Sequence, residues 1–294
     1  MDSASTLAHS DGPYMVRIDK RDGAKLLSDQ CDGIPQRRPD HSNGARYPII
    51  NKLIEHALAA RLTSTPLCAD AWMLSRQSLA SCHAGLSTLL NSEERGRADS
   101  FFVEQDRRGF IVARALLRIL IAAYCSCDPK EVEFQYGPYG KPKLVTPSYR
   151  SQDFGFNMSH SADSVVIALV TDAEIGVDIE ELSAGSSQSE VIADSCLNGE
   201  EVLRIKYLPV STRARTLLRY WTHKEASLKA IGCGLSMSPQ NLTIMFKDSD
   251  RSVILRADPT GRQTLFGYDL PCGEDYVGAI VSPYPLPQPR FFRL

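Results

Sequence analysis

Two carboxylates at alternating positions near the middle of the chain are the first candidates for chemistry. Asp178 and Glu180 lie in the segment Gly176-Val-Asp-Ile-Glu-Glu181, where Val177 and Ile179 alternate with them. Successive side chains point to opposite faces of a strand, so this pattern predicts a strand with one apolar face and both carboxylates on the other. Oxygen ligands favour a hard ion such as Mg²⁺ or Mn²⁺ over zinc. The alternative is a strand end that runs into a solvated acidic turn.

A third carboxylate lies in a segment over 217–231 with helical periodicity. Its apolar stripe consists of Leu217, Trp221, Leu228 and Ile231. Glu225 falls on the same stripe, where an unpaired carboxylate costs several kcal/mol of desolvation unless it is paired or bound to a cation. We therefore expect Glu225 to complete a metal site with the first two carboxylates. The alternative is an ion pair with Lys229 at the rim, worth about 0.2–0.5 kcal/mol.

Several basic and polar residues could bind a phosphate. Lys141 lies in Gly140-Lys-Pro-Lys143, which lacks the pattern of a Walker loop but can present a lysine as a point charge; such loops are also often simply solvated. In Asn157-Met-Ser-His-Ser161, Ser159 and His160 point to opposite faces of a strand, so we expect them to donate to an anion rather than to act as a nucleophile–base pair. Further positive charge lies ahead of the amphipathic stretch 109–124, at Arg95, Arg97, Arg107 and Arg108. His223 is expected at the surface.

These residues need a scaffold of helices and strands. Helical patterns cover 49–62, a long stretch that opens at Ser92-Glu93-Glu94 and is most amphipathic over 109–124, and 217–231. Strand patterns cover 69–75, 154–159, 165–170, 175–179, 242–246, 253–255 and 276–281. The segment 137–142 is expected to be a loop, and the tail over 282–289, with four prolines, is expected to be extended rather than packed as strand or helix.

Three pairs of short segments predict an internal duplication. Segment 113–120 resembles 224–231 at an offset of 111, 154–158 resembles 266–270 at 112, and 166–170 resembles 277–281 at 111. Two similar helix-and-sheet halves would pack together and leave a cleft between them, which is a favoured position for a ligand site. We therefore expect the chemistry where the halves meet.

Composition excludes some functions. The chain has 33 basic and 35 acidic residues, a balance that gives no overall attraction to nucleic acid or membranes. The longest apolar stretch, 110–127, contains Arg114 and Arg118 and is unsuited to cross a bilayer. The N-terminus lacks the pattern of a secretory signal, so we expect a soluble cytoplasmic protein whose eight cysteines are thiols.

Together the motifs resemble the 4′-phosphopantetheinyl transferases of the surfactin-synthetase-activating type over roughly residues 69–281. The resemblance rests on Gly140-Lys-Pro142, Phe156-Asn-Met-Ser-His160, Gly176-Val-Asp-Ile-Glu180 and Trp221-Thr-His-Lys-Glu-Ala226 with Lys229. It implies an α+β fold, a pseudo-dimer of two similar α/β halves with the active site between them. The expected division is an N-terminal extension, partly disordered or helical, over 1–66, a first half over 67–180, and a second half with a Pro-rich tail over 181–294.

The resemblance also implies an activity. The family transfers the 4′-phosphopantetheine arm of coenzyme A to a serine of an apo acyl or peptidyl carrier protein and releases 3′,5′-ADP, which makes it a holo-[acyl-carrier-protein] synthase. Its metal is Mg²⁺, with Mn²⁺ as a substitute, at positions that match Asp178, Glu180 and Glu225. The matching catalytic positions are Glu225, as general base, and Lys224. Positions that match coenzyme contacts are Arg97, Arg108, Lys141, Ser159, His160, Lys224 and Lys229. The family often has arginine where Gly109 stands, which shifts the expected 3′-phosphate contact to Arg108.

Two other functions remain open at this point. The same carboxylates and lysines would serve a Mg²⁺-dependent hydrolase of a nucleotide diphosphate bond, or a module that binds coenzyme A or a carrier without turnover. We expect a monomer, because a duplicated chain needs no second copy to build the cleft.

Overall fold

The computed structural model describes residues 48–63, 67–145, 154–183, 189–247, 251–258 and 261–294. Seven of the eight cysteines lie in these residues, and all seven are free thiols, as expected. Within these ranges no helix combines the length and apolar character that a bilayer crossing needs.

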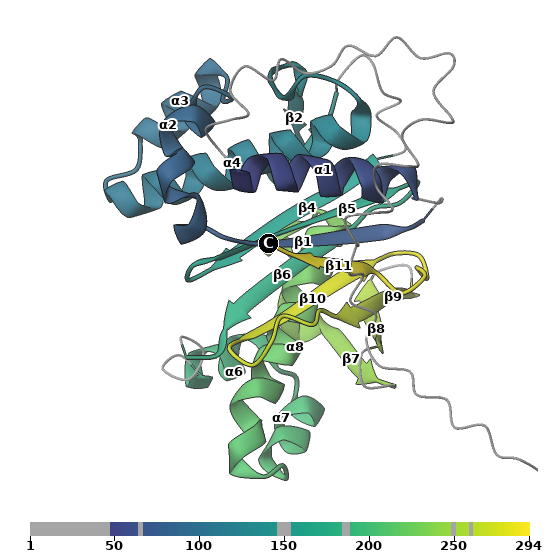
Figure 1. The fold of residues 1–294 in the computed structure, drawn as a ribbon. Helices are drawn as coiled ribbons and strands as arrows, with labels where there is room; N and C mark the ends of the chain where they lie inside the picture. Colours follow the sequence, from purple (N-terminus) through teal and green to yellow (C-terminus); the bar gives the residue numbers. More distant parts are fainter. Residues whose placement is uncertain (1–47, 64–66, 146–153, 184–188, 248–250, 259–260) are drawn as a thin grey trace, which may run out of the picture.

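The helices and strands follow one another in two similar groups (Figure 1). The first group contains α1 (Pro48–Leu62), β1 (Ala69–Ser75), α2 (His83–Ser87), α3 (Ser92–Asp99), α4 (Glu104–Cys125), β2 (Phe134–Tyr136), β3 (Pro142–Leu144), β4 (Phe154–Ser161) and β5 (Ser164–Thr171). The second contains β6 (Gly176–Glu181), α6 (Ser189–Cys196), α7 (Gly199–Lys206), α8 (Val210–Ile231), β7 (Leu242–Phe246), β8 (Arg251–Asp258), β9 (Gly261–Asp269), β10 (Tyr276–Ser282) and β11 (Arg290–Arg293).

Two sheets pack face to face, and helices cover their outer faces. Among the described residues one sheet has the order β11-β1-β5-β4 and the other β6-β10-β9-β8-β7. Figure 1 shows α1 to α4 above the first sheet and α6 to α8 below the second. Alternation along β5 explains the layers, because Ile167 and Leu169 pack toward the upper helices while Ala168 and Val170 pack between the sheets. The fold is therefore α+β, as predicted.

The strand topology confirms the predicted duplication. In the first half β1 pairs antiparallel with β5 and β5 with β4; in the second, β6 pairs antiparallel with β10 and β10 with β9. For β5 and β10, however, the predicted residue alignment is wrong by one position. It matches Ala168 and Val170 with Ala279 and Val281, but the first two lie between the sheets and the second two face α8. A shift of one residue moves every side chain of a strand to the other face.

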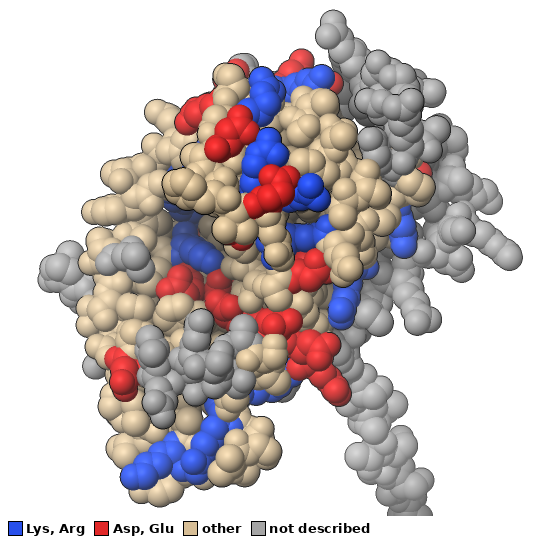
Figure 2. Space-filling view, turned by 90° about the vertical axis from the view of Figure 1, so that its left-hand side faces the viewer, with Lys and Arg blue, Asp and Glu red and all other residues tan. Residues whose placement is uncertain are grey.

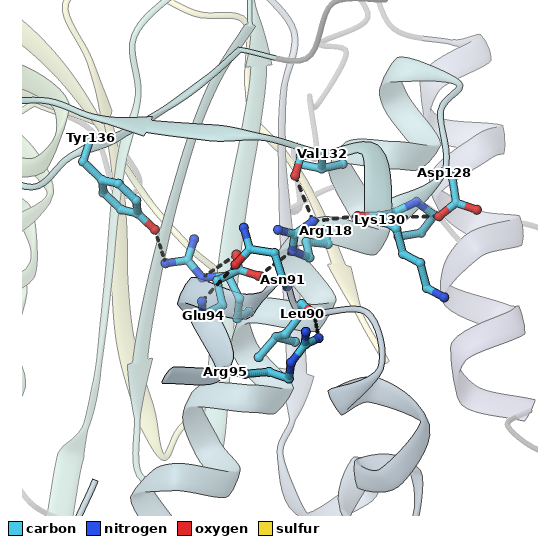
Figure 3. Close-up of polar contacts among 11 residues, drawn as sticks. Leu90, Asn91, Glu94, Arg95, Arg118, Asp128, Lys130, Val132 and Tyr136 are labelled. Atoms are coloured by element: carbon cyan, nitrogen blue, oxygen red, sulfur yellow. Dashed lines mark hydrogen bonds and ion pairs between the residues drawn. The ribbon is translucent and has the colours of Figure 1, made fainter. Parts of the chain in front are cut away.

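A buried ion pair anchors α3 to α4 in the first half (Figure 3). Asn91 caps α3 in a reciprocal capping box with Glu94, so that both exchange hydrogen bonds with backbone amides. The Glu94 carboxylate lies 2.8 Å from Arg118 Nε and 3.6 Å from Arg114 Nε on α4. Arg118 also donates to the carbonyl of Val132 at 2.8 Å. The guanidinium groups that interrupt the apolar stretch of α4 are therefore structural.

The second half repeats this arrangement with different residues. Asn198 caps α7 in a capping box with Glu201, and Glu201 Oε2 lies 2.5 Å from Lys224 Nζ on α8. The helices α4 and α8 both have 22 residues and begin 106 positions apart (210 − 104), and Lys224 stands 106 positions after Arg118 (224 − 118). Lys224 is thus the second-half counterpart of Arg118, and its partner Glu201 is the counterpart of Glu94. The predicted helix alignment, whose offset of 111 matched Arg118 with Lys229, is therefore wrong.

The division at residue 180 does not match the pairing of the strands. It falls inside β6, which pairs with β10 and belongs to the second sheet, so the halves meet between β5 and β6. Residues 283–289 of the Pro-rich tail form neither strand nor helix, as predicted. The chain then continues into β11, which pairs parallel with β1 in the first sheet. The predicted helix in the extension is α1, which packs on α4 through Leu53 and Ala57; residues 1–47 lie outside the described part.

Three smaller expectations have different outcomes. The long helix that was expected to open at Ser92 is two helices, α3 and α4. Residues 137–141 are a loop, as predicted, and form the turn of a hairpin closed by a hydrogen bond from the amide of Gly137 to the carbonyl of Lys141; only Pro142 differs, because it begins β3. Strand β9 was not predicted, although the repeat included its segment 266–269.

The contact between β6 and α8 depends on Gly176. A Cβ atom at this position would lie 2.0 Å from the carbonyl oxygen of Ala226 and 2.5 Å from the amide nitrogen of Ala230, both on α8. We expect Gly176→Ala to lower the free energy of unfolding by at least about 1–3 kcal/mol, because two backbones must move apart. Urea unfolding measures the loss.

Gly96→Ala is the matched control for this prediction, because a Cβ atom on that α3 residue meets nothing within 4 Å. Alanine there is expected to raise stability by up to about 1 kcal/mol through helix propensity. Equal unfolding midpoints for the two variants would contradict the role of Gly176.

Candidate active site

The acidic pair lies on the face of β6 that points toward α8. Val177 and Ile179 are fully buried between the sheets, and Asp178, 3% exposed, and the half-buried Glu180 lie on the other face. This is the alternation that the sequence predicts. The local pattern therefore places both carboxylates where the second sheet meets its central helix.

Hydroxyl groups from the first half hold this pair across the junction of the halves. Every second residue of β4 contributes: Ser159 Oγ donates to Asp178 Oδ1 at 2.7 Å, and Ser161 Oγ donates to Glu180 Oε2 at 2.9 Å. Asn157 Oδ1 accepts from a backbone amide of β6 at 3.1 Å. The edges of the two sheets are thus joined by side chains, and the carboxylates lie between the halves, where the sequence places the chemistry.

One face of α8 completes the site with residues four positions apart. Trp221 Nε1 donates to Glu180 Oε1 at 3.3 Å, and Lys229 Nζ donates to Asp178 Oδ1 at 2.6 Å. Glu225 lies between them on the same helical face. All three α8 side chains are half-buried on a helix that is otherwise largely buried from Leu217 onward. The prediction that Glu225 shares the apolar stripe is therefore wrong in detail. Leu217 and Leu228 of that stripe are buried, whereas Glu225 lies with Trp221 and Lys229 on the more open face of this part of α8.

Burial and neighbouring negative charge raise the pKa of two of the carboxylates, Glu180 and Glu225. Burial raises the pKa of Glu225, the charges of Asp178 and Glu180 raise it further, and Lys229 opposes the shift. Burial and the charge of Asp178 likewise raise the pKa of Glu180. Carboxylates crowded in this way hold a proton, or attract a cation, more readily than isolated ones.

Asp178 Oδ2 fits a cation. It is buried without a hydrogen-bond partner among the described residues. Three carboxylates around such an atom form an oxygen donor set suited to Mg²⁺. In the described part of the chain, however, no three His, Cys, Asp or Glu side chains are arranged closely enough to hold a metal ion. Instead, Lys229 donates to Asp178 Oδ1, and Trp221 and Ser161 donate to the Glu180 carboxylate.

His160 and Ser159 point to opposite faces of β4, as predicted. Ser159 is buried against Asp178, and His160 is exposed. Loss of hydration around the ring and the nearby charges of Arg76 and Lys229 lower the pKa of His160, while Asp106 and Asp178 oppose the shift. His160 is thus neutral near pH 7 and can donate one hydrogen bond.

Two α8 residues are placed differently from the sequence-based expectation. The Lys224 side chain is fully buried and donates to Glu201 and, at 2.8 Å, to the carbonyl of Cys196, so it points to α7 and α6 rather than to the carboxylates. His223, expected at the surface, is also fully buried, and burial lowers its pKa. Its Nε2 lies 3.5 Å from Asp269.

Three other predicted coenzyme contacts have partners within the protein. Lys141 Nζ donates to Glu174 Oε2 at 2.5 Å and to the carbonyl of Ala230 at 2.9 Å, which places it at the C-terminal end of α8. Arg108 is exposed and pairs with Glu104. Arg97, also exposed, lies over the ring of Phe110 on α4.

Figure 2 shows how charge is distributed on one face of the molecule. Acidic side chains gather across its middle, and basic side chains lie above and below them. Such a mixed surface suits a ligand that carries phosphate groups beside a cation site.

The structure adds residues that sequence reasoning missed. Ser161 and Trp221 hold Glu180, and Arg76 lies near His160. Ser161 carried a signal, since it alternates with Ser159, and Trp221 lies four positions before Glu225. No local pattern indicates Arg76, which follows β1 far from the other motifs in sequence.

Comparison with known proteins places both halves in one family. Residues 70–172 match the model described as 4′-phosphopantetheinyl transferase, N-terminal, and residues 174–281 match the 4′-phosphopantetheinyl transferase superfamily. A phosphopantetheinyl transferase from Thraustochytrium sp. is 30% identical over 218 residues, which cover 70% of this chain and 75% of that protein. The 4′-phosphopantetheinyl transferase of Bacillus subtilis is 26% identical over 67% of this chain and 83% of that protein.

Other matches are more partial. Relatives from Synechocystis sp. and Nostoc sp. are 38% and 33% identical, and the matched regions span about three fifths of their length, 61% and 63%. A holo-(acyl-carrier-protein) synthase from Bacillus anthracis, solved in complex with CoA (3′,5′-ADP), covers 37% of this chain and 94% of its own, at 20% identity and a TM-score of 0.33. A structural similarity this low carries no information about the residues of the candidate active site.

The Thraustochytrium relative and the two adjoining family matches agree with the repeated topology and with the acidic cluster between the halves. The chain belongs to the 4′-phosphopantetheinyl transferase family.

Proposed function

We propose that this protein transfers the 4′-phosphopantetheine arm of coenzyme A to a serine of an apo acyl or peptidyl carrier protein and releases 3′,5′-ADP. The observation that carries the proposal is the convergence of Asp178, Glu180, Glu225 and Lys229 at the junction of the halves. The names of the relatives support it, and none of those named above is a hydrolase. The named transferases also weigh against a module that only binds coenzyme A.

The reaction needs a base beside a phosphate-binding site. In the proposed step the oxygen of the carrier serine forms a bond to the β-phosphorus of coenzyme A, and the bond from that phosphorus to the oxygen of the departing 3′,5′-ADP breaks. Glu225 accepts the proton of the serine hydroxyl, since its raised pKa makes it a better proton acceptor than an exposed glutamate. Lys229 supplies positive charge to the diphosphate.

Asp178, Glu180 and Glu225 are the residues that we propose hold Mg²⁺ or Mn²⁺. The unpaired oxygen of Asp178 and the mutual repulsion of the carboxylates support this assignment. When bound, the ion would neutralise negative charge on the diphosphate of coenzyme A and on the oxygen that leaves with 3′,5′-ADP. If the three carboxylates hold a metal ion, the Lys229 ammonium would have to give up its hydrogen bond to Asp178 Oδ1. The ammonium would then be available to bind a phosphate.

Two further parts of the proposal concern the state of the protein. We propose that it acts as a monomer, because a single chain supplies both walls of the site. We also propose that it acts in the cytoplasm, where coenzyme A and newly made carrier proteins meet.

The test uses intact-protein mass spectrometry of several apo carriers after incubation with this protein, coenzyme A and Mg²⁺. We expect one carrier to gain the mass of a phosphopantetheinyl group on its serine and 3′,5′-ADP to appear in equal amount. Release of 3′,5′-ADP without any carrier would indicate a hydrolase instead, and no gain on any carrier would contradict the proposal.

Removal of metal is expected to stop the transfer. With EDTA the rate should fall by at least about 100-fold, because the carboxylates then repel the diphosphate, and excess Mg²⁺ or Mn²⁺ should restore it. The initial rate of carrier modification is the measurement. An EDTA-treated protein that keeps its full rate would contradict the metal assignment without touching the transferase assignment.

A further inference from the structure

Lys141 lies in the tight turn of the β2–β3 hairpin, and its side chain reaches from the first half to the second. Two backbone hydrogen bonds close the turn, from the amide of Gly137 to the carbonyl of Lys141 and from the amide of Gly140 to the carbonyl of Gly137, both at 2.9 Å. The backbone of the first half therefore fixes the point from which the lysine side chain starts.

The end of α8 leaves space for this turn. Gly232 ends the helix with a φ of 74°, a conformation that favours glycine, and a Cβ atom there would lie 3.1 Å from Lys141 Cδ. A Cβ atom on Gly234 would lie 3.5 Å from Tyr139 Cβ, so a second residue of the turn packs beside the first. The hairpin of the first half thus rests on the C-terminal end of α8.

The ammonium group of Lys141 has an acceptor for each of its three N–H donors. It donates to Glu174 Oε2 at 2.5 Å, to the carbonyl of Ala230 at 2.9 Å and, more weakly, to the carbonyl of Ile175 at 3.5 Å. The side chain is only 13% exposed, and burial lowers the pKa of Lys141 while Glu174 opposes the shift. An ammonium group held in this way has no donor left for a diphosphate.

These acceptors belong to the two elements that carry the acidic site. Two of them lie on residues that lead directly into β6, and the third, Ala230, lies in the last turn of α8, where helical carbonyls lack partners within the helix. Lys229 ties the same turn to β6 through Asp178 Oδ1. That hydrogen bond is lost when Lys229 moves to a phosphate, whereas the contacts of Lys141 remain.

We propose that Lys141 is a positioning residue for the transfer: it holds the last turn of α8 on the start of β6 and so keeps Glu225 and Lys229 aligned with Asp178. The inference rests on the proposed function, which supplies the reaction. It replaces the coenzyme contact that the family resemblance implies for this lysine. The two roles differ kinetically, because misplaced groups slow the chemical step, whereas loss of a contact that binds the substrate raises KM.

The first test is Lys141→Met in the transfer assay, with rates expressed per folded molecule. We expect kcat to fall by about 10–100-fold, because a displacement of about 1 Å can cost 10²-fold, while the KM for coenzyme A changes by less than about 3-fold. Lys143→Met, the same change at an exposed lysine of the same hairpin, is the control and should alter neither constant. A higher KM with an unchanged kcat would make Lys141 a coenzyme contact, and two unchanged constants would make its role purely structural; either result overturns the inference.

Glu174→Gln loosens the same contact from the solvent side, where the Glu174 side chain is 48% exposed and its amide should not disturb folding. We expect kcat to fall by about 2–10-fold, because the ammonium group keeps its other two acceptors. If Lys141 served the coenzyme instead, removal of the competing carboxylate would free it and lower the KM for coenzyme A. A lower KM with an unchanged kcat would therefore contradict the inference.

Amide hydrogen exchange followed by mass spectrometry tests the position of α8 without any substrate. In Lys141→Met the amides of residues 228–232 should exchange at least about 10-fold faster than in the wild-type protein, because the last turn of α8 loses the contact that holds it. Lys143→Met should exchange as the wild type does. An unchanged rate in Lys141→Met would overturn the inference, whereas wild-type protein that modifies no carrier would overturn the proposed function.

Discussion

Glu225→Gln should lower the rate of carrier modification by at least about 100-fold while coenzyme A binding largely survives. The amide has nearly the shape of the carboxylate but accepts no proton, and loss of a general base costs about 10²–10⁴-fold. Burial and the two neighbouring carboxylates raise the pKa of Glu225, so wild-type activity should increase with pH as this group loses its proton. Removing one of three crowded carboxylates also relieves repulsion, which explains why binding of the donor should persist.

Single-turnover transfer and calorimetric binding of coenzyme A separate the two effects. Glu200→Gln is the matched control, since Glu200 is an exposed residue of α7 and its amide should transfer at the wild-type rate. A Glu225→Gln protein that remains active would remove Glu225 from the mechanism. One that is inactive and also fails to bind coenzyme A would assign it to binding alone.

The second large effect concerns stability rather than catalysis. Lys224→Met should lower the free energy of unfolding by about 3–5 kcal/mol, because it leaves the Glu201 carboxylate buried without its cation. That carboxylate also accepts from the amides of Asn198 and Ile244 at 3.0 and 3.1 Å, so α7 and β7 should loosen with it. Urea unfolding followed by circular dichroism measures the change.

The double variant Lys224→Met/Glu201→Gln tests the cause. Without either charge no ion is left unpaired, and most of the lost stability should return. Transfer measured per folded molecule then decides the role of Lys224, which we expect to be structural. A Lys224→Met protein with wild-type stability and no activity would restore the catalytic role that the family resemblance implies.

The sequence alone determined the local geometry of the acidic strand and the order of the main elements. A period of two over Gly176–Glu181 fixes which side chains share a face, whatever the strand packs against. Helical periodicity likewise predicted α1 and α8, and strand patterns predicted β1 and β6 within two residues of their ends. The sequence also predicted the duplication, because three short segments of the first half resemble three segments of the second half in the same order.

Only the tertiary structure decided which faces of those elements serve the site. On a central helix such as α8, nearly every face is buried, so apolar periodicity cannot separate Glu225, which faces β6, from its neighbour Lys224, which faces α7. Arg76, which follows β1, lies against Gly109 of α4, and no local pattern indicates that contact. Contacts of this kind join residues that lie far apart in the chain, and their positions follow from how the layers pack. The acidic residues of the site could therefore be predicted from the sequence. Which lysine contacts them, Lys229 and not Lys224, follows from the way α8 packs between its neighbours.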